Sequence, residues 1–213
     1  MCAFVTSCSH NFTTVDYLSF AGRYMEQLRT HIEKVIPLTD DEFEIIRPFF
    51  TARKVRKNQF LVQQGDNVRC EFLVLGGTYR IFYADDDGKE HIVQFATENW
   101  WMSDYIAYFN NRQANMFVVC MEAGEVLCLT LEGREELAAK LHKMEHFFRV
   151  KLTNGYIALQ QRILSLLSHN SEQRYEEFAR LYPDLMQKIP KKYIAEYLGV
   201  SRETLSRLYT NSK

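Results

Sequence analysis

The sequence contains no run of 18 consecutive apolar residues, and its first twenty residues have neither a basic start nor a clean apolar core. A membrane-spanning helix needs roughly 18 or more apolar residues in succession. A secretion signal needs a basic start followed by an apolar core. We therefore expect no membrane partner and a cytoplasmic protein.

The cysteines do not form a recognisable framework. They are dispersed along the chain without a C-x-x-C pair: Cys2, Cys8, Cys70, Cys120 and Cys128. An odd, scattered set of this kind predicts reduced thiols rather than structural disulfides.

Catalytic signatures are missing as well. The sequence has no glycine-rich phosphate loop, nucleophile elbow or paired-carboxylate motif, so it does not predict an enzyme. His142 and His146 lie one helical turn apart beside Glu145, but this pattern is not the H-E-x-x-H of zinc enzymes. We therefore predict no metal site.

Charge is nearly balanced overall but unevenly distributed. The formal net charge is −1, whereas the segment from Met186 to the end carries +4 and the remaining 185 residues carry −5. A basic segment on an acidic body suits contact with a nucleic-acid duplex. Lysines clustered on a solvated face would give the same pattern.

Residues 191–210 predict two short helices joined by a tight turn. Ala195 is small enough for the second helix to cross closely over the first, and Gly199 accepts the positive φ that the turn requires. Apolar residues at helical spacing point to a shared interior: Ile194, Leu198, Val200, Leu205 and Leu208. This pattern is typical of a helix-turn-helix.

The second of these helices carries polar residues suited to reading DNA. Ser201 is a good N-cap, because its hydroxyl can accept an unpaired amide of the first turn. The outward face then presents Arg202, Glu203, Ser206 and Arg207. Arginine pairs bidentately with guanine and glutamate accepts from cytosine. The alternative is an ordinary helical hairpin with a solvated polar face.

The N-terminal part predicts helices. Residues 25–50 show helical periodicity, and Thr39 with Glu42 makes a capping box. Residues 1–24 differ in kind, and we expect them to be a poorly ordered extension or the product of a start codon misassigned upstream of Met25.

Residues 53–130 predict short strands and turns. Strands are expected at 59–66 and 71–77, a hairpin at 78–95, and two further strands around Gly124. Strands this closely spaced favour a β-barrel or jelly roll, which removes exposed edges.

Helical periodicity returns after Glu132 for about 37 residues. A narrow apolar stripe recurs at steps of three and four: Phe148, Leu152, Tyr156, Leu159, Ile163 and Leu166. Such a stripe is typical of a helix that packs against its twin. The alternative is a helix packed on its own barrel. A further helix over 174–188, interrupted near Pro183, would lead to Pro190 at the start of the helix-turn-helix.

The order of these elements, together with G-V-S-R-E-T-L-S-R at 199–207, resembles the cyclic-AMP receptor protein/fumarate–nitrate regulator (CRP/FNR) family of bacterial transcription factors. The resemblance runs from about Met25 onward. It implies an α+β fold: an effector-sensing β-roll (jelly-roll, cyclic-nucleotide-binding-like) domain with N-terminal helices at 25–131, a long dimerisation helix at 132–169, and a helix-turn-helix DNA-binding domain at 170–213.

The resemblance also assigns DNA contacts. The residues expected to read base edges are Arg202, Glu203 and Arg207. Those expected to touch phosphate or base are Ser201, Thr204 and Ser206. Family members usually continue into a β-hairpin wing, whereas this sequence stops at Lys213. Some contacts with the DNA backbone are then missing, or they come from Lys188, Lys191 and Lys192.

The expected effector pocket departs from the family pattern. Members that bind cyclic nucleotides have a G-E-L-type turn and a later Arg-Ser or Arg-Thr pair that holds the phosphate. Alignment through A-G-E-V at 123–126 places Asp104 at the turn and Ala114-Asn115 at the pair, with Arg112 out of register. A carboxylate facing a phosphate without an arginine is electrostatically unfavourable, so cyclic AMP is not expected.

Aromatic residues crowd the same region: Trp100, Trp101, Tyr105, Tyr108 and Phe109. They either cradle an apolar or planar effector or fill the barrel and leave no pocket. We take Asp104, Ala114, Asn115 and Trp101 as candidate pocket residues.

Other cofactors find little support. Cys2 and Cys8 lie outside the resembling region and lack the close spacing of iron–sulfur cysteines, so no cluster is expected. Haem is not expected either, and a visible spectrum would test for it.

The sequence thus predicts a homodimeric, sequence-specific DNA-binding transcription regulator. Its partners would be a palindromic double-stranded DNA site, RNA polymerase and a small effector other than cyclic AMP. The rival interpretation is a ligand-sensing or protein-interaction module whose helix-turn-helix is vestigial.

Overall fold

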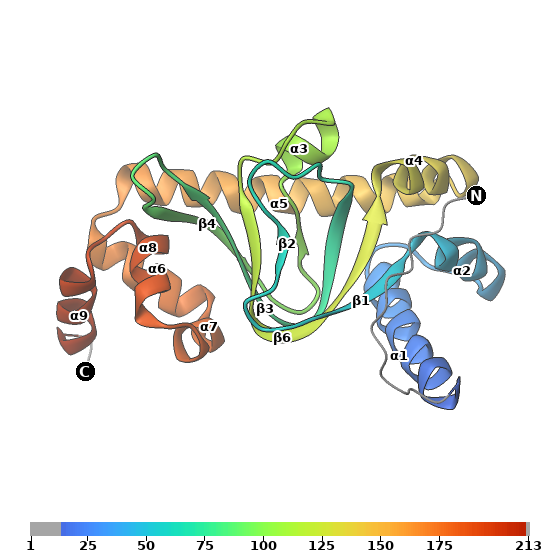
Figure 1. Ribbon diagram of the computed structural model, residues 1–213, viewed down its shortest axis with the longest axis horizontal. Coiled ribbons are helices and arrows are strands. Elements are labelled where there is room, and N and C mark those ends of the chain that lie inside the picture. The colour runs from blue at the N-terminus through green and yellow to red at the C-terminus, as the bar shows by residue number, and fades with distance from the viewer. Residues whose placement is uncertain (1–13, 212–213) are drawn as a thin grey trace.

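The structure is a computed structural model that describes residues 14–211, with the side chains of residues 22–210. Its elements follow one another in this order: α1 Thr14–Glu33, α2 Asp40–Ile46, the 3-10 turn η1 Arg47–Phe49, β1 Thr51–Val55, β2 Phe60–Val62, β3 Cys70–Ala84, β4 Glu90–Ala96, β5 Trp101–Met102, α3 Tyr105–Asn110, β6 Phe117–Thr130, α4 Leu131–Lys140, α5 Lys143–Ser168, α6 Ser171–Leu181, α7 Pro183–Lys188, α8 Lys191–Leu198 and α9 Arg202–Asn211. The described elements confirm the expected α+β fold, with helices before and after a β-roll (Figure 1).

The sheet is antiparallel and is organised around its two longest strands. Its order is β1-β6-β3-β4, with β2 also pairing with β6 and β5 with β3. The hairpin predicted at 78–95 is confirmed as the end of β3, a turn with Gly88 at φ +76°, and β4.

The strand boundaries differ from the prediction. Segments 71–77 and 78–84 are one strand, β3, and the segments on either side of Gly124 are one strand, β6. The glycines mark a bend inside paired strands rather than a turn: a Cβ on Gly124 would lie 2.0 Å from the Gly76 carbonyl oxygen. Backbones that approach this closely need glycine, and the register shifts at the same place.

Helix α1 begins at Thr14, eleven residues before Met25, so part of the segment expected to be an extension is helical. Tyr24 is fully buried in a core that it shares with Leu28 and Ile32. The capping box of Thr39 and Glu42 at the start of α2 is confirmed. Cys2 and Cys8 lie outside the described residues.

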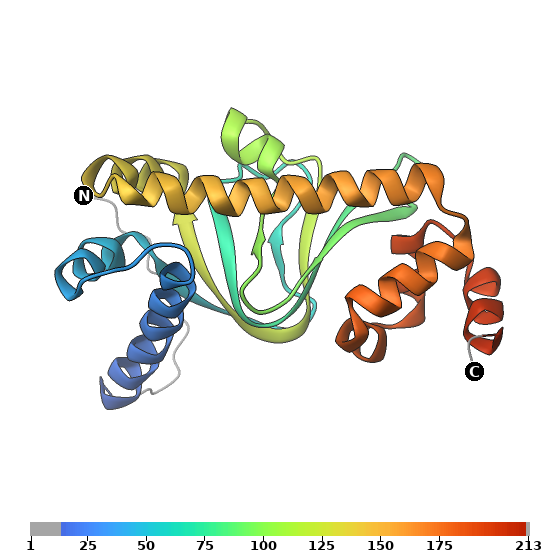
Figure 2. The same ribbon diagram turned by 180° about the vertical axis from the view of Figure 1, so that it is seen from behind.

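The single helix predicted over 132–169 is two helices, α4 and α5. Leu141 has φ −135° and ψ 86°, which ends α4, and its side chain packs against the core formed with α1. Helix α5 then crosses the whole length of the roll, uncovered over most of its length (Figure 2).

The stripe predicted on this helix divides into two parts. Phe148 is buried in the core of its own chain. The remaining members are exposed by 43–66 %: Leu152, Tyr156, Leu159, Ile163 and Leu166. Packing on the chain's own barrel therefore accounts only for the first turn of the stripe.

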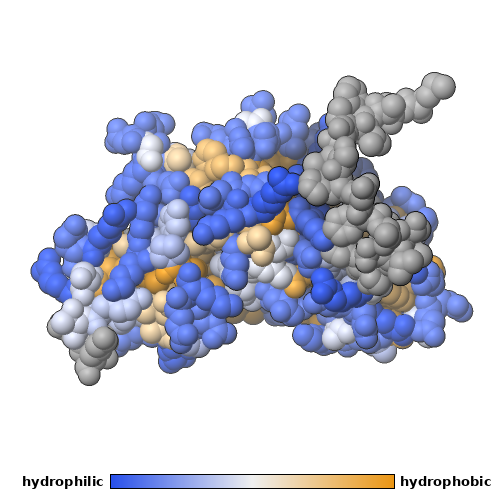
Figure 3. Space-filling model, turned by 60° about the horizontal axis from the view of Figure 1, so that its bottom comes forward, coloured by the Kyte–Doolittle hydropathy of each residue, from blue (hydrophilic) through white to orange (hydrophobic). Residues whose placement is uncertain are grey.

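On the face shown in Figure 3, polar side chains cover most of the described surface, with smaller apolar areas between them. Among residues 14–211, no helix is both long and apolar enough to cross a membrane.

Candidate nucleic-acid interface

Helices α8 and α9 form the helix-turn-helix that the sequence predicted. Gly199 adopts φ +67°, the left-handed conformation that ends α8. The Val200 amide then donates to the Ala195 carbonyl at 3.0 Å, which closes the turn. Ala195, Leu198 and Leu205 are buried where the two helices meet. Local chemistry and packing thus agree on the crossing of the two helices.

Ser201 caps α9 as predicted. The Thr204 amide donates to Ser201 Oγ at 3.1 Å, and the two hydroxyls lie 3.2 Å apart. The Ser201 hydroxyl also lowers the pKa of Glu203, so the Glu203 carboxylate is ionised near neutral pH. An anion at a helix N-terminus is further favoured by the helix dipole.

The outward face of α9 is open to solvent. Arg202, Glu203, Ser206 and Arg207 are all exposed, while Thr204 is half-buried. Within the described part of the chain, neither Arg202 nor Arg207 forms an ion pair at 4 Å or less, so both guanidinium groups are available for a partner. Helix α9 lies at the outer edge of the molecule, away from the roll (Figure 1).

The two predicted lysines lie at the start of α8. Both are exposed. Lys191 Nζ lies 4.1 Å from the centre of the Tyr209 ring, and Lys192 Nζ lies 3.7 Å from a carboxylate oxygen of Glu196. Lys191 thus lies beside α9, whereas Lys192 has an acidic partner within α8.

The helix-turn-helix packs directly on the β3–β4 hairpin. The Arg80 guanidinium donates to both carboxylate oxygens of Glu90, at 2.6 and 3.2 Å, and lies 4.3 Å from the ring centre of Tyr193 in α8. Beside this pair, the Phe95 ring contacts those of Tyr197 and Phe178. No sequence pattern indicated this contact, because its residues lie far apart in the chain.

Arg162 of α5 joins three parts of the fold. It donates to the carbonyl oxygens of Ile92 in β4, at 3.4 Å, and Tyr197 in α8, and its guanidinium stacks 3.4 Å from the Tyr197 ring centre. Arg174 of α6 donates to the Leu198 carbonyl at 3.0 Å. Burial lowers the pKa of Arg162.

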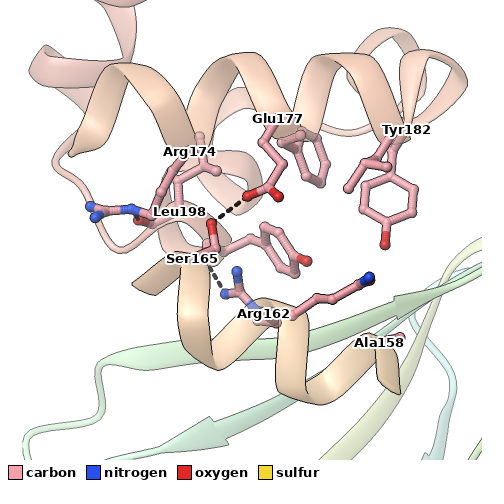
Figure 4. Close-up of a pocket in the computed structure, with 11 residues that line it drawn as sticks. Ala158, Arg162, Ser165, Arg174, Glu177, Tyr182 and Leu198 are labelled. Carbon is pink, nitrogen blue, oxygen red and sulfur yellow. Dashed lines mark hydrogen bonds between the residues drawn. The ribbon is translucent and has the colours of Figure 1, made fainter. Parts of the chain in front are cut away.

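These two arginines bind the last carbonyls of α8, which have no partner within the helix. A cation at this end also interacts favourably with the helix dipole. The two side chains line a cavity of about 40 Å³ between α5, α6 and α8 (Figure 4). Room of this size suits a few water molecules. The arginines therefore hold the helix-turn-helix to α5 and α6.

The candidate pocket residues fall into two groups. Asp104 is buried and accepts the amides of Ala107, Asn115 and Met116 at 3.1, 2.9 and 3.1 Å. Ala114 is buried beside it, and Asn115 is exposed. The Asp104 carboxylate thus occupies the amides where the resemblance puts a phosphate.

Trp101 lies apart from that group, which corrects its place in the expected pocket. Its Nε1 donates to His31 at 3.1 Å, and its ring packs against Phe50 and Phe147. Met102, its neighbour in β5, points into the roll, and successive side chains of a strand point to opposite faces.

The other aromatic residues do not share one environment, since Phe109 is exposed and Trp100 lines a cavity. Tyr108 is buried within the roll, and its hydroxyl lies 3.4 Å from the Leu129 carbonyl. A larger cavity of about 400 Å³ lies elsewhere, between the Gly76–Gly77 bend, Trp100 and the α6–α7 connection. The sequence did not indicate it, because its walls come from segments far apart in the chain.

Comparison with known proteins agrees with this architecture. The profile of the cyclic nucleotide-binding domain family matches residues 52–140. The chain is 26% identical over 188 residues to the regulatory protein HlyX of Actinobacillus pleuropneumoniae, covering 81% of this chain and 77% of HlyX. It is 22% identical over 185 residues to the cAMP-activated global transcriptional regulator CRP of Escherichia coli O157:H7, covering 81% and 87%.

Solved structures show the same fold. FixK2 from Bradyrhizobium japonicum superposes with a TM-score of 0.65 at 15% identity, over 76% of this chain and 83% of FixK2. The c-di-GMP-responsive regulator CLP of Xanthomonas campestris gives a TM-score of 0.64 at 14% identity, over 81% and 91%.

Proposed function

We propose, from the premise that this chain belongs to the CRP/FNR family of transcription regulators, that it binds a palindromic DNA site as a homodimer through α9. The observation that carries the proposal is the open face of α9, where Arg202 and Arg207 lack ion-pair partners among the described residues. Arginine and an ionised glutamate on a solvent-facing helix are the groups that read base edges in the major groove.

The proposed dimer rests on the exposed stripe of α5. Five large apolar side chains in one row face solvent along a helix that spans the roll. A contiguous apolar row of this length marks an interaction surface. A twofold pairing of α5 with its copy would set two α9 helices about 34 Å apart, the repeat of successive major grooves.

The proposed effector differs from cyclic AMP. Because the Asp104 carboxylate already takes the amides of Asn115 and Met116, an anionic phosphate placed there would meet a negative charge. An effector would act by shifting a balance between dimers whose α9 helices do and do not match the groove spacing. Contact with RNA polymerase belongs to the same proposal.

The experiment that tests DNA reading is selection from a random oligonucleotide pool, followed by binding assays on the enriched site. Arg207→Ala should lose roughly 1–3 kcal/mol of preference at one base pair. Lys191→Ala, the matched control on α8, should weaken all sequences alike and flatten the salt dependence. A pool that shows no enrichment supports the rival, a sensing module with a vestigial helix-turn-helix.

The dimer is tested separately. Leu159→Glu places a charge in the centre of the stripe and should convert the dimer to a monomer in analytical ultracentrifugation, because a buried unpaired carboxylate is costly. The control is Gln160→Glu, which adds the same charge at an exposed position beside the stripe and should leave the dimer intact. Loss of dimer in both variants, or in neither, contradicts the assignment.

A further inference from the structure

Two thiols lie together at one end of the sheet. Cys70 is the first residue of β3, and Cys128 stands near the end of β6. The strands are antiparallel, with Cys70 opposite Thr130 and Phe72 opposite Cys128. Cys70 and Cys128 are therefore diagonal neighbours on the same face of the sheet.

The two thiols also influence each other's pKa. A hydrogen bond with Cys128 lowers the pKa of the Cys70 thiol, and the same bond raises the pKa of Cys128. Side chains at diagonal positions on one face of a strand pair are close enough to interact.

The surroundings favour a thiolate at Cys70. Arg53 of β1 and Arg69, the residue before β3, both lower the pKa of Cys70 through their charges, and Glu132 opposes them. Arg53 stands opposite Val126 in β6, two residues from Cys128 and on the same face. The thiolate is the nucleophilic form of cysteine, and nearby cations stabilise it.

Exposure to solvent distinguishes Cys70 and Cys128 from Cys120, the third cysteine among the described residues. Cys70 and Cys128 are each partly exposed, whereas Cys120 is buried. The Cys120 thiol lies 3.0 Å from the Glu122 carbonyl, and burial raises its pKa. Cys120 thus supplies an internal control for reactivity.

We propose that Cys70 and Cys128 form a redox-active dithiol that a hydroperoxide converts to a disulfide across β3 and β6. The Cys70 thiolate attacks a peroxide oxygen, the O–O bond breaks, and a sulfenic acid and hydroxide form. The Cys128 sulfur then attacks Cys70, the S–O bond breaks, and the oxygen leaves as water with the Cys128 proton. In total, two thiols and one hydrogen peroxide give a disulfide and two water molecules, and a dithiol reductant reverses the change.

This disulfide would link the strand end that contacts the segment before α3 with the strand end that leads into α4. The Cys70 carbonyl accepts from Ser103 Oγ at 3.0 Å, just before α3, and Thr130, two residues after Cys128, is the N-cap of α4. Oxidation would therefore fix the segment that carries Asp104 relative to the start of α4.

The test is peptide mapping of the full chain. After hydrogen peroxide, mass spectrometry under non-reducing conditions should recover a Cys70–Cys128 cross-linked peptide that dithiothreitol removes. Quantitative alkylation of both residues as free thiols after peroxide would overturn the proposal, as would disulfides that join them only to other cysteines. This measurement needs no variant and so does not depend on the folding of a mutant.

Variants separate the two steps. Cys128→Ser should halt the reaction at a Cys70 sulfenic acid, which dimedone traps. Cys120→Ser should form the cross-link as the wild type does. Equal dimedone labelling of Cys70 in the wild type and in Cys128→Ser would show that Cys128 does not resolve the sulfenic acid, and would refute the proposal.

Discussion

Lowering the pH should destabilise the protein through one histidine. His31 is only 2 % exposed and lies between two partners. Trp101 Nε1 donates to its Nε2 at 3.1 Å, and its Nδ1 lies 3.2 Å from the Asn99 side-chain oxygen. These partners assign the neutral tautomer with the proton on Nδ1. Protonation of Nε2 would break the bond from Trp101 and bury a charge.

The expected loss of folding stability follows from how far the pKa of His31 is lowered in the folded protein. Burial, with a smaller contribution from Lys151 and Lys34, lowers the pKa of His31 from 6.5 to about 4, against the opposing hydrogen bond to Asn99. The unfolded chain therefore takes up this proton first as the pH falls. The contribution of neutral His31 to the free energy of unfolding is therefore fully present above about pH 6.5 and is lost as the pH falls towards 4. The loss amounts to about 1.4 kcal/mol per pH unit, or about 3 kcal/mol in total.

The assay is urea unfolding at several pH values between 7.5 and 4. His31→Gln keeps a group that can pair with both Trp101 and Asn99 but cannot be protonated in this range. Carboxylates that titrate in the same window affect both proteins, so the difference between wild type and variant isolates the histidine. A difference that stays constant with pH would refute the reasoning.

Two further predictions concern buried arginines. Arg134→Ala should cost roughly 3–5 kcal/mol in denaturant unfolding, because it leaves Glu71, buried and bonded to Arg134 at 2.6 Å, without its partner. Replacing both Arg134 and Glu71 by leucine should recover most of that loss. Equal stability of the single and double variants would contradict the assigned role of the ion pair. Arg162→Gln should speed amide exchange in α8 by roughly tenfold or more, since it removes charged hydrogen bonds to Ile92 and Tyr197. Arg180→Gln, which replaces an exposed arginine, should leave amide exchange in α8 unchanged. If neither variant changes this exchange, Arg162 does not anchor α8.

Features encoded by neighbouring residues were predictable from the sequence. The turn at Gly199 and the cap at Ser201 depend on a φ angle and a hydroxyl within a few residues of their partners. The capping box at Thr39 is equally local. The placement of Arg202 and Arg207 on the open face of α9 follows from helical periodicity once both ends of the helix are known.

Other features depended on partners far along the chain. Gly76 and Gly77 look like a turn in the sequence, yet pairing with β6 continues β3 through them as one bent strand. Trp101 looks like a pocket residue, but strand alternation turns it towards His31. These outcomes depend on which surfaces meet, and a local pattern does not specify that.

The sequence by itself determined the two helices of the helix-turn-helix, the hairpin and the apolar stripe of α5, because short-range hydrogen bonds and periodicity fix them. Only the tertiary structure decided which residues hold the helix-turn-helix against the rest of the chain. Arg162 meets carbonyls 70 positions before it and 35 positions after it, and Arg80 meets the ring of Tyr193. A guanidinium group can satisfy many acceptors, so its partner is set by packing and not by its neighbours in the chain.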